Sequence, residues 1–219
     1  MIKIQNISLT IRKTPILKNV STEFEAGKIH GLIGRNGSGK TMLMKCICGF
    51  IRPTSGVILV DGKRIGKDFD FPESVGIIIE TPGFIPYFSG LRNLRLLADL
   101  NKRVSIEKIR ETMKMVGLDP DEKRHVRKYS LGMRQRLGLA QALMENPALL
   151  ILDEPMNGLD KDGVADMRRY LLDLKAAGKT ILIASHSSED IETLCDTVSE
   201  MDKGVLTACS AESAGRPMA

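Results

Sequence analysis

The sequence predicts an α/β fold with a mainly parallel sheet, an N-terminal antiparallel β subdomain and a helical lobe at about residues 85–145. In the last third of the chain, short apolar strands alternate with helical stretches, the pattern of a parallel sheet with crossover connections. The first third consists of strands joined by turns, and the middle third has apolar residues at helical spacing. A chain of 219 residues, 42% of them hydrophobic, can bury a core for one domain with such a lobe.

The first third is expected to be mostly strand. Strands are predicted at 2–11, 16–24 and 28–33, and a helix is predicted at 40–49. The apolar run 57–60 enters an Asp61-Gly62 turn, which is a strong hairpin signal. These elements form the expected antiparallel subdomain and the start of the parallel sheet.

The remaining elements complete the lobe and the sheet. A buried strand is expected at 75–79, and the lobe has helices at 91–100, 106–116 and 131–144. Strands then follow at 149–152 and 180–184, each with a helix after it, at 164–177 and 188–194. The domain is expected to span 1–206, because the segment 207–219 is small, polar and without periodicity and so predicts a flexible tail.

A phosphate-binding loop joins the strand at 28–33 to the helix at 40–49. Its eight residues are Gly34-Arg35-Asn36-Gly37-Ser38-Gly39-Lys40-Thr41. The glycines let backbone N–H groups turn inward around an anion, and the helix presents its positive N-terminal end. Lys40 adds a cation, and Thr41 offers a hydroxyl to Mg²⁺. A glycine-rich turn that binds nothing is the alternative, but the order strand, loop, helix favours a P-loop NTPase core.

Two adjacent carboxylates end the strand at 149–152. Asp153 and Glu154 thereby lie at the carboxyl edge of the sheet, where open α/β sheets bind ligands. Asp153 is expected to hold Mg²⁺, mostly through its water shell, and Glu154 to polarise the water that attacks the γ-phosphate. A simple strand-ending turn is the alternative, and the phosphate loop makes the nucleotide interpretation the better one.

A third motif begins the helix at 131–144. Ser130 is a good N-cap, and its hydroxyl together with the N–H of Gly132 makes a small anion-binding helix end. Capping chemistry alone would favour an ordinary capped helix.

With these three motifs in their order, the chain resembles the ATP-binding subunit of ABC transporters over nearly every residue up to about Leu206. Residues 34–41 match Walker A, 149–154 match Walker B, 155–160 match the D-loop, and 130–133 stand where the family has LSGGQ. His186 follows the strand at 180–184 and occupies the place of the switch histidine. On its own, a histidine after a strand would more often be a surface residue.

The resemblance implies an ATPase with ATP and Mg²⁺ as cofactors. Glu154 and His186 would be catalytic, with His186 contacting the γ-phosphate, while Asp160 would help to couple two sites. ATP would lie between the Walker A loop of one subunit and the Ser130–Gly132 helix end of another, in a homodimer or heterodimer. The ATP cycle would move an integral membrane permease that is a separate polypeptide.

The chain departs from the common family pattern in three places. Glu80 stands where most members have a glutamine, and is expected at the Mg²⁺ site. The LSGGQ position reads Tyr-Ser-Leu-Gly-Met over 129–133, and Ile11 falls near the adenine-stacking aromatic, so that the purine would rely on aliphatic contact. The segments 79–84 and 130–138 resemble the subgroup that exports bacitracin-like peptides and lantibiotics, which implies export of a peptide antibiotic or similar amphiphile and a role in antibiotic resistance.

Composition bears on location and partners. The longest apolar runs fall far short of the roughly 20 residues that cross a bilayer, so we expect a cytoplasmic protein held peripherally on the inner face of the cell membrane. The net charge of +5 is concentrated in 102–136, a stretch with no aromatic before Tyr129 to stack on bases, so no nucleic acid partner is expected.

Two other functions remain open. A soluble ABC ATPase acting on nucleic acid or ribosomes would use the basic stretch, but such proteins usually carry a coiled coil or a second cassette. A different P-loop kinase or GTPase would leave Ser130, Gly132 and His186 without a role.

Overall fold

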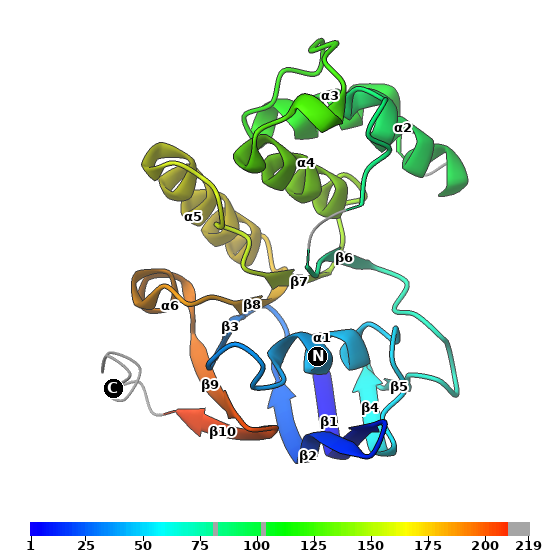
Figure 1. Ribbon diagram of the computed structural model, residues 1–219, viewed down its shortest axis with the longest axis vertical. Helices are drawn as coiled ribbons and strands as arrows, with labels where there is room; N and C mark the ends of the chain where they lie inside the picture. The colour runs from blue at the N-terminus through cyan, green and yellow to red at the C-terminus, as the bar shows by residue number, and fades with distance from the viewer. Residues whose placement is uncertain (81–82, 102–103, 210–219) are drawn as a thin grey trace.

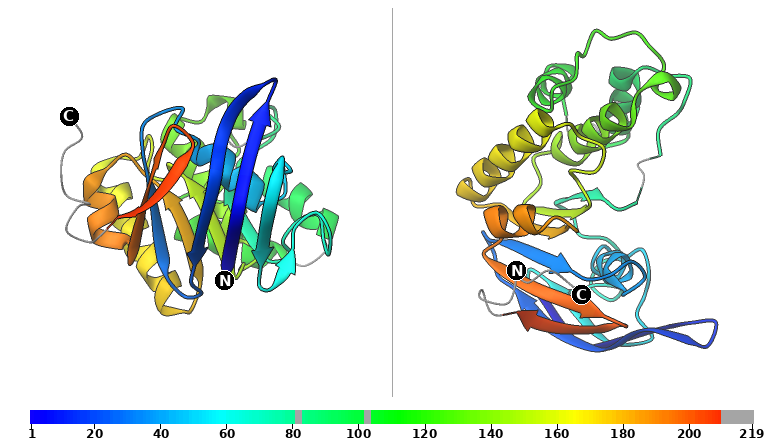
Figure 2. Two further views of the ribbon diagram at one scale, coloured as in Figure 1. Left: turned by 90° about the horizontal axis from the view of Figure 1, so that it is seen from below. Right: turned by 60° about the vertical axis from the view of Figure 1, so that its left-hand side comes forward.

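The computed structural model describes residues 1–80, 83–101 and 104–209. An antiparallel sheet with strand order β2-β1-β4-β5 forms one layer of the molecule and is seen face-on in the left view of Figure 2. Its strands are β1 (Ile2–Ile11), β2 (Thr14–Phe24), β4 (Ser55–Val60) and β5 (Lys63–Arg64). The turn between β4 and β5 has positive φ at Asp61 (49°) and Gly62 (78°), which is the backbone that a two-residue hairpin requires.

A second, six-stranded sheet has the order β10-β9-β3-β8-β7-β6. All neighbouring pairs in it are parallel except β9 with β10. Its strands are β3 (Ile29–Ile33), β6 (Val75–Ile78), β7 (Leu149–Asp153), β8 (Thr180–Ala184), β9 (Thr197–Asp202) and β10 (Val205–Cys209). The mainly parallel sheet and the antiparallel subdomain of the predicted fold class are therefore confirmed.

Apolar side chains cover both faces of the six-stranded sheet. On β7, Leu149 and Ile151 pack toward helix α1 (Lys40–Ile47) and the antiparallel sheet, whereas Leu150 and Leu152 pack on the opposite face. The opposite face is covered by residues of α4 (Leu131–Leu143), α5 (Lys161–Ala176) and the segment around α6 (Ser188–Leu194). A strand buried on both faces reads as a continuous apolar run, which is why β7 was predictable. Figure 1 shows α1 between the two sheets.

The helical lobe lies at one end of the molecule, at the top of Figure 1. It consists of α2 (Gly90–Asn101), α3 (Ile106–Met115), the short η1 (Val126–Lys128) and α4 (Leu131–Leu143). Ser130 caps α4 as predicted, since its Oγ accepts a hydrogen bond from the N–H of Met133 at 3.1 Å. The helices of the chain that the structure describes are all too short or too polar to cross a membrane.

Helix α5 and strands β9 and β10 differ from the expected elements. Helix α5 begins three residues earlier than predicted, because Asp160 caps it by accepting a hydrogen bond from the N–H of Gly163 at 3.1 Å. Strands β9 and β10 were not predicted, and β10 extends to Cys209, so 207–209 lie in a strand. The rest of the predicted tail, 210–219, lies outside the described residues, and the domain limits 1–206 stay a prediction.

Candidate functional site

The loop between β3 and α1 is shaped by three glycines with positive φ. They are Gly34 (141°), Gly37 (78°) and Gly39 (118°). A Cβ on Gly34 would lie 2.2 Å from the carbonyl oxygen of Met201, so only glycine fits against the sheet there. A Cβ on Gly37 would meet no atom within 4 Å. The loop is thus packed closely at Gly34 and open at Gly37, on the side where a ligand would approach.

Lys40 crosses the inside of this loop. Its side chain is buried, and its ammonium donates hydrogen bonds to the carbonyl oxygens of Gly34 (2.5 Å) and Arg35 (3.2 Å). Burial lowers the pKa of Lys40, while the carboxylates of Glu154 and Asp153 act to raise that pKa. Ser38 lies in the same loop with a buried hydroxyl oxygen that has no hydrogen-bond partner among the described residues. A positive charge and an unpaired polar atom of this kind suit an anion.

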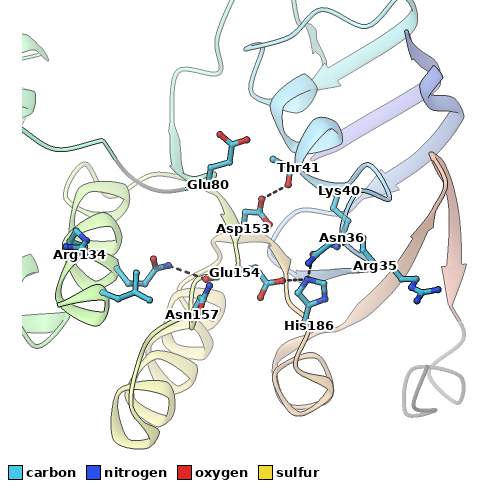
Figure 3. A pocket seen from close by; sticks show the side chains of 13 residues that line it. Arg35, Asn36, Lys40, Thr41, Glu80, Arg134, Asp153, Glu154, Asn157 and His186 are labelled. Atoms are coloured by element: carbon cyan, nitrogen blue, oxygen red, sulfur yellow. Dashed lines mark hydrogen bonds and ion pairs between the residues drawn. The ribbon is translucent and has the colours of Figure 1, made fainter. Parts of the chain in front are cut away.

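The oxygen donors expected for a metal lie side by side. The hydroxyl of Thr41 donates a hydrogen bond to Asp153 Oδ2 at 2.8 Å (Figure 3). Hydroxyl and carboxylate oxygens are the ligands that Mg²⁺ takes, usually with water and phosphate oxygens completing its shell. Within the described part of the chain, no group of three or more His, Cys, Asp or Glu residues forms a self-sufficient metal site. The pair fits a Mg²⁺ that arrives with a nucleotide.

Glu80 lies near that pair. The strand that precedes Glu80, β6, pairs with β7 in register, with Ile78 opposite Leu152, so both strands end at the same edge of the sheet. Glu80 has a positive φ of 61°, and its carboxylate makes a 2.6 Å ion pair with Lys45 of α1.

Glu154 and His186 come from neighbouring strand ends. Glu154 follows β7 with a φ of 51°, and its N–H donates to the carbonyl oxygen of Ala184 at 2.9 Å. His186 follows β8; its Nε2 lies 3.3 Å from Glu154 Oε1 and hydrogen bonds with Asn36 Oδ1 at 2.9 Å (Figure 3). Burial raises the pKa of Glu154, and the nearby His186 and Lys40 oppose that rise. The site therefore holds a carboxyl group that is a stronger base than an ordinary glutamate.

The turn that carries His186 is fixed by a hydrogen-bond chain. Ser185 Oγ donates to the buried carboxylate of Asp190 at 3.0 Å and accepts from the N–H of Ser187 at 3.1 Å. Asp190 in turn accepts two hydrogen bonds from Arg168 of α5, at 2.8 and 2.6 Å. The position of His186 therefore depends on helices α5 and α6 as well as on strand β8.

Two side chains of α4 connect the lobe to Glu154 and the segment that follows it. Gln135, on α4, donates from Nε2 to the carbonyl oxygens of Glu154 (3.2 Å) and Pro155 (3.1 Å) and is nearly buried. Asp160, five residues after Pro155, caps α5 and lies 3.4 Å from the guanidinium of Arg136, another α4 residue. Sequence reasoning missed Gln135, since nothing in its spacing shows that its amide reaches the Walker B segment.

A cleft of about 300 Å³ gathers most of the predicted site residues. Those that line it are Arg35, Asn36, Gly37, Lys40, Thr41, Glu80, Asp153, Glu154 and His186. The other predicted residues do not line it: Gly34, Ser38 and Gly39, which belong to the loop itself, and Ser130, Gly132 and Ile11. The residues of α4 that line the cleft are Leu131, Arg134 and Gln135.

Gly132 and Ile11 have other surroundings. A Cβ on Gly132 would lie 2.7 Å from the carbonyl oxygen of Gly158, so glycine lets the start of α4 approach the D-loop segment closely. Ile11 ends β1 opposite Thr14 and packs, partly buried, against the core between the two sheets. The predicted contact of Ile11 with a purine stays a prediction.

Comparison with known proteins identifies relatives over most of the chain. A family model described as ABC transporter matches residues 17–157. The uncharacterized ABC transporter ATP-binding protein YybJ of Bacillus subtilis (strain 168) is 46% identical over 206 residues, covering 94% of this chain and 94% of the relative.

Two further relatives are named for peptide antibiotics. The bacitracin transport ATP-binding protein BcrA of Enterococcus faecalis is 39% identical over 208 residues, covering 94% of this chain and 68% of the relative. The lantibiotic transport ATP-binding protein SrtF of Streptococcus pyogenes is 39% identical over 206 residues, covering 94% and 89%.

Among solved structures, an ATP-binding cassette in a dimeric, post-hydrolysis state with ADP and Pi matches the fold with a TM-score of 0.87. It is 22% identical and covers 96% of this chain and 99% of that chain.

Proposed function

This chain belongs to the ABC transporter family, and we propose that it is the ATP-hydrolysing subunit that pairs with a second such subunit to drive a separate membrane permease. The observation that carries the proposal is the convergence of Lys40, Thr41, Asp153, Glu154 and His186 on one cleft. Lys40 would supply a cation that binds phosphate, and Thr41 and Asp153 would supply metal ligands. Glu154 would be a base, and His186 would contact the γ-phosphate. These are the groups that phosphoryl transfer needs.

The phosphate loop would bind the β- and γ-phosphates. Lys40 would exchange its bonds to the carbonyls of Gly34 and Arg35 for phosphate oxygens, and the buried Ser38 hydroxyl would gain a partner. Thr41 and Asp153 would hold Mg²⁺, which when bound neutralises charge developing on the phosphate oxygens. The Ser38 hydroxyl costs free energy while it is buried without a partner, and bound phosphate would remove that cost.

Glu154 would act as the general base. It would accept a proton from the water that attacks the γ-phosphorus, while the bond between that phosphorus and the bridging oxygen of ADP breaks. Burial raises the pKa of Glu154 toward neutral pH, and a general base is most efficient when its pKa is near the working pH. His186 would donate from its ring to the γ-phosphate in place of Asn36 and keep the water in line.

The proposed pairing with a second subunit is supported by two predicted site residues, Ser130 and Gly132, that do not line the cleft. Ser130 and Gly132 present an anion-binding helix end but do not line the cleft of their own chain. In a pair, that end would cover the γ-phosphate bound to the other subunit, and ATP would hold the two subunits together until hydrolysis.

The transported molecule is proposed from the relatives. Those named for bacitracin and lantibiotic transport are 39% identical to this chain, which supports export of a peptide antibiotic or a similar amphiphile. The chain would then act on the cytoplasmic side of the membrane, attached through its permease, and contribute to antibiotic resistance.

Substitution of the base tests this function. Glu154→Gln keeps the size of the side chain but cannot accept a proton, so we expect ATP hydrolysis to fall by about 100-fold or more while ATP is still bound. Because bound ATP then persists, size-exclusion chromatography with Mg-ATP should show more dimer than for the unmodified chain. Lys40→Ala is the contrasting variant, since it should weaken ATP binding itself. Hydrolysis by Glu154→Gln at the unmodified rate would contradict the proposal.

A further inference from the structure

Three carboxylates face the cleft in which a triphosphate would bind. Asp153 and Glu154 are balanced by Lys40, whose pKa they act to raise. Glu80 also lines the cleft, and Lys40 is engaged with the loop carbonyls. A third negative charge beside an anionic substrate would weaken binding unless another group neutralises that charge.

Lys45 is placed to do this. Its ammonium lies 2.6 Å from Glu80 Oε1, and its own side chain is only 22% exposed. Lys45 comes four residues after Thr41 in α1, so both point from the same face of the helix. That face therefore contacts the ends of two adjacent strands: Thr41 donates to the carboxylate after β7, and Lys45 to the one after β6.

We propose that Lys45 is a positioning residue for Glu80, which holds the carboxylate in one orientation and neutralises its charge so that it can stand beside bound ATP. The proposal rests on the proposed function in one respect, that the cleft binds ATP. It explains how a carboxylate can occupy a position where the family pattern has a neutral glutamine. Because Glu80 is 63% exposed, the ion pair contributes little to folding stability, and its effect is expected in ligand binding.

Equilibrium binding of ATP without Mg²⁺ tests the charge argument directly. Lys45→Met retains an apolar stem of similar length but leaves Glu80 unneutralised, and should weaken ATP binding at low salt on the order of threefold to tenfold. The double variant Lys45→Met/Glu80→Gln removes both charges, and should bind within about twofold of the unmodified chain. Glu80→Gln alone should bind ATP more tightly, because it leaves the Lys45 cation free. Raising the salt should reduce all these differences, which a purely structural defect would not do.

Control variants separate the possible outcomes. Lys3→Met removes an exposed ion pair with Glu23 on the antiparallel sheet and should bind ATP as the unmodified chain does. Lys45→Arg keeps the charge and should retain binding. Unchanged affinity in Lys45→Met, a loss that Glu80→Gln does not restore, or Glu80→Gln binding no more tightly would each overturn the role of Lys45. If the unmodified chain bound no ATP, the proposed function itself would fail.

Discussion

Asp153 and Glu154 are adjacent at the end of β7, but their different surroundings give the two carboxylates different chemical properties. Asp153 accepts a hydrogen bond from Thr41 and keeps a position suited to a metal ligand. Glu154, one residue on, turns away with a positive φ and has a buried oxygen, and this burial raises its pKa. Two carboxylates in sequence can therefore serve two tasks, because the backbone turn at Glu154 separates their environments.

The pH dependence of hydrolysis should reveal this difference. Only the deprotonated Glu154 can act as a base, so activity should fall as the pH drops through its pKa, and this acid limb should lie above the ordinary glutamate value of 4.5. The measurement is kcat/KM against pH, with ATP binding measured at each pH so that titration of the nucleotide is accounted for. An acid limb at or below the ordinary value would contradict the role of burial.

The sequence predicts the residues of this site better than their positioning partners. The phosphate loop and the Walker B carboxylates were predictable because one continuous strand and one turn position them. Lys45 and Gln135 were not, since each acts across a tertiary contact, from α1 to the end of β6 and from α4 to the end of β7. The spacing of four between Thr41 and Lys45 was a signal that pointed to a shared helix face.

At the scale of elements, helices α5 and α6 hold the turn with His186 through one arginine. Arg168 is 16% exposed and its partner Asp190 only 3%, so the pair is largely shielded from solvent. Glu189 and Asp190 raise the pKa of Arg168, which stays charged. Removing one member of such a pair leaves a buried charge without a partner, and this is more costly than losing an exposed ion pair.

Arg168→Met should therefore destabilise the protein by about 2 kcal/mol or more and slow ATP hydrolysis on the order of tenfold, as the turn with His186 loosens. The neighbouring Arg169 offers a matched control, because its ion pair with Asp166 is 75% and 61% exposed. Arg169→Met should change stability by no more than about 0.5 kcal/mol. Urea unfolding and steady-state ATPase rates measure both effects, and equal unfolding midpoints for the two variants would refute the prediction.

Elements whose own sequence carries their signal were predicted, and those that depend on neighbours were not. Strand β7 is a continuous apolar run, and α4 has both a cap and helical periodicity. Strand β9 mixes polar and apolar residues and takes its conformation from parallel pairing with β3. Strand β10 is held by β9 alone in the sheet order, so its polar sequence gave no indication of it.

At the scale of the whole molecule, the arrangement of the helical lobe and the sheets determines which side chains line the cleft of one chain. The cleft lies between the phosphate loop and the first turn of α4, and Gln135 of α4 hydrogen bonds to the carbonyl oxygens of Glu154 and Pro155. The start of α4 at Ser130, which is proposed to bind an anion, does not line the cleft of its own chain through Ser130 or Gly132. In the proposed pair, each chain would contribute half of each of two nucleotide sites, and its ATP cycle would act on a partner.

That partner is predicted to be a membrane protein with several spanning helices. Tagged Glu154→Gln chain, loaded with Mg-ATP and incubated with detergent-solubilised membranes from the native cell, should retain such a protein, because the ATP-bound pair dissociates slowly when hydrolysis is blocked. The tag alone is the control for non-specific capture, and nuclease treatment removes partners held only through nucleic acid. Recovery of ribosomal proteins or DNA in place of a membrane protein would favour the soluble ATPase, whose basic stretch at 102–136 would then bind the phosphate backbone and lose its partner at high salt.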